Sequence, residues 1–109
     1  MNRDLHDIVG LAQRAGALRI GQKNIREALK NGERLLVLLT SDRSRNVEAM
    51  LRGYESRGQC RVVVMPECTR YELGHSVSRR EAQIAGIPAE HGLSKKIQAL
   101  TAKGGNLDE

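Results

Sequence analysis

The sequence predicts an α/β protein, and specifically a three-layer α/β/α sandwich around a small mixed sheet. Segments whose apolar residues have helical spacing alternate along the chain with short, uniformly apolar runs. Glycine or proline lies beside these runs, which favours buried strands over the cores of helices. The 109 residues are enough for one domain with a hydrophobic core. We assign residues 1–103 to this domain and residues 104–109 to a flexible tail.

The N-terminal segment predicts an amphipathic helix. Its apolar residues recur at helical spacing, with charged and polar residues between them: Leu5, Ile8, Val9 and Ala12. We expect this helix to end near Gly16, because glycine commonly terminates helices. Residues 17–20 are then expected to form a short extended link.

The predicted functional site is organised around the stretch 21–32. It opens with glycine and three polar residues, and its later apolar residues have the spacing of a buried helix face: Ile25, Ala28 and Leu29. Asn31 and Gly32 are expected to end this helix. The five apolar residues 35–39 follow almost at once and predict a buried strand.

A third helix and a second strand are expected next. Ser41 and Asp42 offer an N-cap, and Gly58 is expected to end the helix. Its buried stripe lies at positions i, i+3, i+4 and i+7: Val47, Met50, Leu51 and Tyr54. Residues 61–65 are rich in valine and predict a second buried strand before Pro66.

The C-terminal third predicts a helix, a loop, a strand and a helix. Thr69 and Glu72 have the spacing of a weak capping box, which starts a short helix. Residues 76–80 form a basic connection to a third main strand over 82–87, which Pro88 ends. The last helix has apolar positions spaced for burial: Leu93, Ile97 and Leu100.

The charge balance favours an anionic partner. Eighteen Lys and Arg residues against 13 acidic residues give a net charge of +5 and a pI near 9.7. Nucleic acid is the first candidate, and a merely soluble basic surface is the alternative. Trp and Phe are absent, which argues against modules that stack bases on aromatic platforms. Recognition would therefore depend on backbone, amide and guanidinium groups.

No pattern typical of catalysis or metal binding is found. The chain has neither a Walker loop nor a GxGxxG motif, and its three histidines are scattered. Cys60 and Cys68 lack the further Cys or His of a zinc site. We expect no enzyme activity, no cofactor and no metal. Without an apolar signal segment or a membrane span, a cytoplasmic protein with reduced thiols is expected.

The order of the motifs resembles one family. This is the kink-turn-binding ribosomal-protein superfamily of archaeal and eukaryotic large subunits, and in particular its small bacterial, YlxQ-like branch. The resemblance extends from about residue 4 to residue 103. It rests on residues 11–16, on 21–32 with the strand that follows, on Glu72-Leu73-Gly74, on 76–80 and on 92–97.

The resemblance implies an α/β/α sandwich that docks on a sharply bent RNA internal loop. The turn that starts the second helix would enter the major groove at tandem sheared G·A pairs, and a second loop would pack on an extruded nucleotide. With the helix N-terminus and the charges, this predicts two groups of RNA-contacting residues. They are Gly21, Gln22, Lys23, Asn24, Arg26 and Glu27, and then Val77, Ser78, Arg79 and Arg80.

Four positions depart from the family pattern. Better-known members have Asn-Glu where this chain has Lys23 and Asn24, and a lysine where it has Glu27. Ser78 stands where the family has a glycine, so the second loop is expected to differ in shape. A carboxylate is repelled by the RNA backbone unless a cation neutralises it, but Glu27 can accept a hydrogen bond from an exocyclic amine.

The leading functional hypothesis is a non-catalytic RNA-binding protein that recognises a structured, kink-turn-like RNA. Ribosomal RNA or a structured leader RNA is the expected partner, the ribosome is a further candidate partner, and the protein is expected to be a monomer. A second hypothesis is a protein-interaction adaptor on the same fold, which Glu27 favours. A third is a detached substrate-docking domain, like those that some RNA methyltransferases carry.

Overall fold

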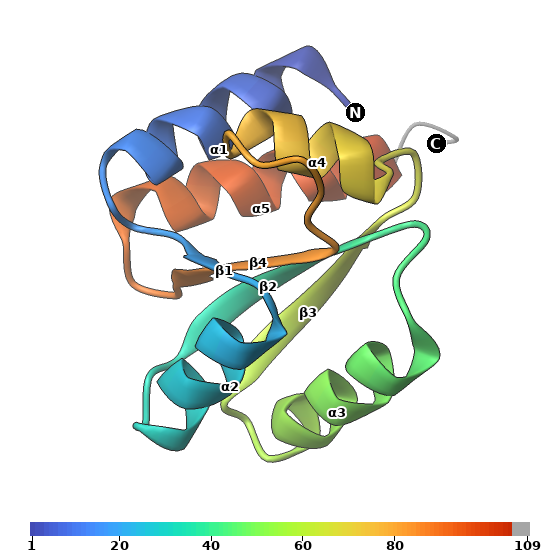
Figure 1. Ribbon diagram of the computed structural model, residues 1–109. Coiled ribbons are helices and arrows are strands. Elements are labelled where there is room, and N and C mark those ends of the chain that lie inside the picture. Colours follow the sequence, from blue (N-terminus) through green and yellow to red (C-terminus); the bar gives the residue numbers. More distant parts are fainter. Residues whose placement is uncertain (106–109) are drawn as a thin grey trace.

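The computed structural model describes residues 1–105, which form five helices and one four-stranded sheet (Figure 1). In chain order the elements are α1 (Arg3–Arg14), β1 (Arg19–Ile20), α2 (Gln22–Lys30), β2 (Leu35–Thr40), α3 (Arg45–Ser56), β3 (Cys60–Met65), α4 (Arg70–Ser76), β4 (Ile84–Pro88) and α5 (Gly92–Gly105). None of these helices combines the length and apolarity that crossing a membrane requires.

The sheet is mixed, as the sequence predicted. Its strand order is β1-β4-β2-β3. Strands β2 and β3 are parallel, whereas β4 runs antiparallel to both β2 and β1. The ends of β1 and β2 and the start of β4 therefore lie at the same edge, since Ile20 pairs with Ala85 and Leu39 pairs with Ile84.

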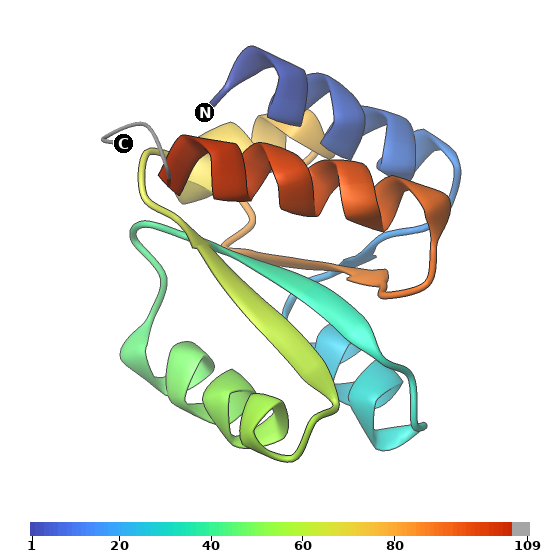
Figure 2. The same cartoon turned by 180° about the vertical axis from the view of Figure 1, so that it is seen from behind.

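Helices cover both faces of the sheet, which confirms the predicted three-layer sandwich. Figures 1 and 2 show α1, α4 and α5 on one face and α2 and α3 on the other. Side chains of β2 alternate between two core clusters because successive residues of a strand point to opposite faces. Leu36 and Leu38 pack with α1, α4 and α5, and Leu35, Val37 and Leu39 pack with α2 and α3. Burial on both faces explains why this strand is uniformly apolar.

The predicted helices are present, with differences at their ends. The capping box of α4 is confirmed: the Thr69 hydroxyl accepts from the Glu72 N–H at 3.2 Å, and the Glu72 carboxylate accepts from the Thr69 N–H at 3.0 Å. The N-cap of α3 is Ser44 and not Ser41 or Asp42, because the Ser44 hydroxyl accepts from the Val47 N–H at 3.1 Å.

Two strand predictions were wrong in detail. The link expected over 17–20 contains β1, a strand of two residues that pairs with β4. Strand β3 is an edge strand and only partly buried, since four of its six residues are exposed or at intermediate depth. At the C-terminus α5 continues to Gly105, and residues 106–109 of the expected tail lie outside the described part of the chain.

Glu55 links α3 to the edge strand through a charge-assisted contact. Its carboxylate accepts from the Val62 N–H at 2.8 Å and from the Arg52 guanidinium at 2.8 Å. These two contacts lower the pKa of Glu55 from its ordinary value of 4.5. Because folding lowers this pKa, the stabilisation is present above the pKa of the unfolded chain and is lost as the pH falls through the folded pKa.

We therefore expect Glu55→Gln to lower the free energy of unfolding by about 1 kcal/mol at neutral pH and by less at about pH 3. Urea denaturation at the two pH values measures the difference. Glu67→Gln is the matched control, because among the described residues the Glu67 side chain forms no ion pair. An equal loss of stability at both pH values would contradict the role of the carboxylate charge.

Candidate nucleic-acid interface

The first predicted loop is held at the sheet edge by Gly21. Its N–H donates to the Ile84 carbonyl at 3.1 Å, and its own carbonyl accepts from the Ile25 N–H at 3.1 Å. The backbone angles of Gly21, φ 91° and ψ 154°, belong to a region that is essentially restricted to glycine. No side chain caps α2 at Gly21. The first N–H groups of this helix are therefore directed out of its N-terminal end without a side-chain acceptor.

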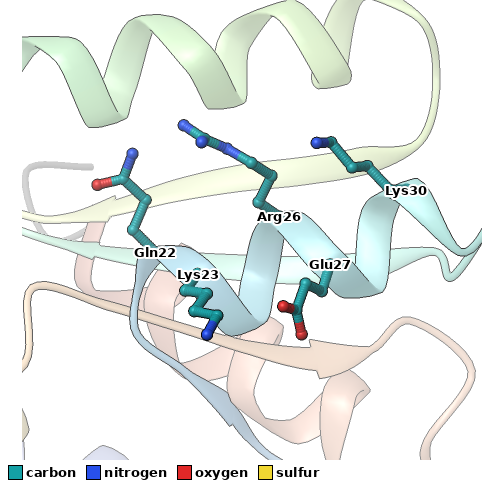
Figure 3. A pocket seen from close by; sticks show the side chains of 5 residues that line it. All are labelled: Gln22, Lys23, Arg26, Glu27 and Lys30. Atoms are coloured by element: carbon teal, nitrogen blue, oxygen red, sulfur yellow. The ribbon is translucent and has the colours of Figure 1, made fainter.

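The exposed side chains of α2 lie in two rows. Figure 3 shows Gln22, Arg26 and Lys30 directed to the side of α3, whereas Lys23 and Glu27 are directed to the other side of the helix. Both rows follow the four-residue spacing of a helical face. Lys23 and Glu27 thus lie in the same row, but their side chains form no ion pair with each other in the described structure.

Asn24 is oriented by the end of β1. Its side-chain Nδ2 donates to the Ile20 carbonyl at 2.9 Å. One of its two amide N–H groups is thereby committed to the backbone, and the Oδ1 acceptor and the second N–H are left for a ligand. Asn24 is exposed, so this amide is held in a fixed orientation at the protein surface.

The second predicted loop is a short, exposed segment between two buried anchors. Val77 and Ala82 are 1% and 8% exposed, and both belong to the hydrophobic core. The Val77 side chain therefore anchors the loop from inside and is not presented at the surface. Ser78, Arg79 and Arg80 are exposed.

The second loop keeps a glycine-like shape without a glycine. Ser78 has φ 59°, which is the left-handed conformation that side-chain-bearing residues seldom adopt. The serine at this position thus accepts the backbone conformation that glycine would adopt freely.

Gly74 allows this loop to fold back onto α4. The Arg79 N–H donates to the Gly74 carbonyl at 2.8 Å. A Cβ at position 74 would lie 2.6 Å from Cα and 2.8 Å from N of Glu81, closer than any side chain tolerates. The missing side chain of Gly74 is therefore what positions Arg79 and Arg80.

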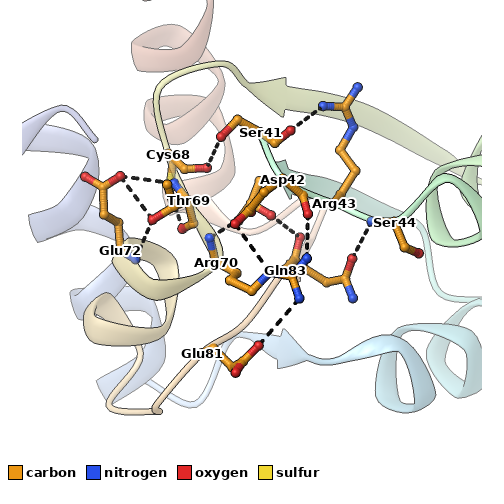
Figure 4. Close-up of polar contacts among 11 residues, drawn as sticks. Ser41, Asp42, Arg43, Ser44, Cys68, Thr69, Arg70, Glu72, Glu81 and Gln83 are labelled. Carbon is orange, nitrogen blue, oxygen red and sulfur yellow. Dashed lines mark hydrogen bonds and ion pairs between the residues drawn. The ribbon is translucent and has the colours of Figure 1, made fainter.

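The two loops are connected through the start of β4. The Gly21 N–H of the first loop donates to the Ile84 carbonyl, and the preceding Gln83 binds the loop after β2: its carbonyl accepts from the Thr40 N–H at 3.1 Å, and its Oε1 accepts from the Ser44 N–H at 2.8 Å. Figure 4 shows the contact between Gln83 and Ser44 together with Arg70, which is paired with Asp42 at 3.3 Å and with Glu81 at 3.6 Å. Strand ends and side chains thus hold the loop after β1, the loop after β2 and the loop before β4 as one unit.

The cations of the candidate interface have no anionic partner in the described part of the chain, a property that they share with other exposed arginines such as Arg34. Elsewhere, Arg19, Arg43, Arg52 and Arg70 form ion pairs with acidic side chains. Within the described part of the chain, the cations of the two loops and α2 form none: Lys23, Arg26, Lys30, Arg79 and Arg80. Glu81, which flanks the two loop arginines in sequence, is engaged by Arg70.

Neither cysteine is activated. Burial raises the pKa of Cys60 and of Cys68 to about 11, so both thiols are protonated at neutral pH. Among residues 1–105, no three His, Cys, Asp or Glu side chains are grouped as a metal site would require.

Sequence reasoning missed two positions that the structure adds to the interface. Lys30 continues the row of Gln22 and Arg26, and its four-residue spacing from Arg26 was a signal that could have identified it. The close approach of Gly74 to the loop was not readable from the sequence, because it depends on contacts between the helix and a loop that folds back.

Comparisons with known proteins agree on the fold. A protein of unknown function from Bacillus halodurans is 29% identical to this chain with a TM-score of 0.82, and the match covers 93% of this chain and 99% of that one. A 15.5 kD RNA-binding protein of Giardia lamblia is 17% identical with a TM-score of 0.65, covering 95% of this chain and 89% of that one. No protein-family model and no curated protein matches the chain.

The close approach at Gly74 leads to a prediction. We expect Gly74→Ala to displace the second loop and to lower the free energy of unfolding by about 1–3 kcal/mol, because the new methyl group overlaps backbone atoms. Amide chemical shifts should change over 78–83 and not in α2. Gly53→Ala is the matched control. A Cβ at Gly53 would have no other atom within 4 Å, and alanine has a higher helix propensity than glycine. Unchanged loop shifts in Gly74→Ala would contradict the steric role.

Proposed function

We propose that this protein is a non-catalytic RNA-binding protein that recognises a sharply bent, kink-turn-like internal loop in a structured RNA. Ribosomal RNA and structured leader RNA are the proposed sources of such a loop, and the protein would bind in the cytoplasm as a monomer. The proposal rests on one observation: two loops joined at one sheet edge carry unpaired cations beside an uncapped helix N-terminus.

The phosphate backbone would be bound by charge and by backbone donors. The free N–H groups at the start of α2 favour an anionic group, and Lys23 and Arg26 add positive charge on two sides of this helix. Arg79 and Arg80 would hold a second part of the bent RNA. A rigid arrangement suits this task because a bent backbone presents phosphates at fixed separations.

Base recognition would depend on Asn24 and Glu27. Asn24 presents an oriented amide, and Glu27 presents an unpaired carboxylate on the side that Lys23 shares. Both can accept hydrogen bonds from base amino groups, whereas phosphate cannot donate to them. Glu27 would thus favour a base edge and disfavour close approach of the backbone, so it would contribute selectivity more than affinity.

The comparisons support this proposal at the level of the fold. The Giardia lamblia protein is described as RNA-binding, and it has the same arrangement of helices and strands along most of the chain. At 17% identity this similarity concerns the fold, and substitutions of individual residues test the proposed RNA contacts.

A protein-interaction adaptor is the second candidate function, and one observation favours it. Glu27 remains without a cationic partner in the described structure although it lies among basic residues. An exposed carboxylate in such a place suits a protein partner with a complementary cation.

Binding of a fluorescent kink-turn RNA tests the proposal. The control RNA has Watson–Crick pairs in place of the tandem G·A pairs, and both are titrated at two salt concentrations. We expect tight binding to the kink-turn RNA only. Asn24→Ala should cost about 1–3 kcal/mol of binding free energy, and Lys23→Ala should lower the salt slope by about one.

Arg34→Ala is the matched control, because Arg34 is an exposed cation next to the opposite end of β2. It removes the same charge from a place that the proposed interface does not include. Equal binding to both RNAs would reduce the function to non-specific RNA binding. Absence of binding to either would support the adaptor.

A further inference from the structure

Arg14 is a basic residue that the interface described above does not use. It is the last residue of α1 and lies in the segment 11–16, one of those that carry the family resemblance. Its side chain is exposed, and within residues 1–105 it forms no ion pair and donates no side-chain hydrogen bond. All five guanidinium N–H groups are thus free for a ligand.

The position of this guanidinium is defined by Gly10. A Cβ at Gly10 would be 3.4 Å from the Arg14 Nη1 atom and 3.4 Å from the Ser76 carbonyl oxygen. The Arg14 side chain therefore lies back over its own helix, next to the place where α1 meets the last turn of α4. Figure 1 shows α1 and α4 side by side, and the two helices are in contact.

The last turn of α4 leads directly into the second loop. Ser76 ends this helix, and the exposed residues Ser78, Arg79 and Arg80 follow within four positions. The loop turns back at once, because the Arg79 N–H bonds to the Gly74 carbonyl at 2.8 Å. Arg14 thus reaches the base of the loop from a different helix.

We propose that Arg14, Arg79 and Arg80 form a second cationic cluster that binds phosphodiester groups of the RNA on the α1 side of the loop. The inference extends the proposed RNA-binding function and depends on it. Three unpaired guanidinium groups from two elements suit phosphate, since the planar arginine fork matches phosphate oxygens in pairs. The cluster would continue the binding surface from α2 across the second loop to the end of α1.

Such a cluster would bind RNA without distinguishing one base sequence from another. Phosphate contacts set the position of a nucleic acid, and contacts to base edges set its specificity. Arg14 should therefore contribute affinity and salt dependence to any RNA that the protein binds, and nothing to the choice between RNAs. This separates its role from that of Asn24 and Glu27.

The test compares Arg14→Gln, Arg14→Lys and Arg34→Gln as full-length proteins. Each is titrated with the kink-turn RNA and the Watson–Crick control RNA over a range of salt concentrations, and its thermal unfolding is recorded. We expect Arg14→Gln to weaken binding about fivefold at physiological salt and to lower the salt slope by about one. Arg14→Lys should keep the slope, because it keeps the charge. Arg34→Gln should change neither quantity.

The outcomes separate this inference from the proposed function. If wild type prefers the kink-turn RNA but Arg14→Gln binds as Arg34→Gln does, the inference is overturned and the proposed function stands. A lower melting temperature of Arg14→Gln with an unchanged salt slope also overturns it, because Arg14 would then act only on the end of the helix. If wild type binds both RNAs equally, kink-turn recognition fails, and a lower slope in Arg14→Gln still supports the cluster. No binding of either RNA by wild type overturns both.

Discussion

The arrangement of the proposed interface depends on β4, the strand that pairs with β1 on one side and with β2 on the other. These two antiparallel pairings bring the start of β4 to the edge where β1 and β2 end. The hydrogen bond from the Gly21 N–H to the Ile84 carbonyl then fixes the start of α2 beside the loop that precedes β4. Gly86 adds to this, because a Cβ there would lie 2.6 Å from Cδ1 of Ile25, so the missing side chain of Gly86 leaves room for Ile25 of α2 to pack against the strand.

Charge follows from this arrangement. Some cations elsewhere on the surface are paired with nearby carboxylates, as Arg43 is with Glu48 at 2.9 Å. At the sheet edge, Asp42 and Glu81 are both engaged by Arg70, so they support the loops and leave the neighbouring cations unpaired. Exposed ion pairs contribute little to stability, so the unpaired cations are not a large loss to the fold. They are available to an anionic ligand.

Local sequence patterns were sufficient for the helices, for β2 and for the capping box at Thr69, because each depends on residues close in the chain. The two-residue strand β1 was not predictable, since its pairing with β4 joins segments far apart in sequence. The same reason applies to the pairing of Arg70 with Asp42. Ser78 shows another limit: its left-handed backbone was not predicted, because residues with a side chain seldom adopt this conformation.

The central claim is that the two loops bind RNA together as one rigid surface. Amide chemical shifts of the labelled protein, followed during titration with the kink-turn RNA, test it most directly. We expect residues 21–27 and 78–81 to shift in parallel with one apparent affinity, while Gly58 and Arg34 at the other end of the sheet stay unchanged. Shifts in only one of the two loops, or shifts spread evenly over all exposed basic residues, would contradict the claim.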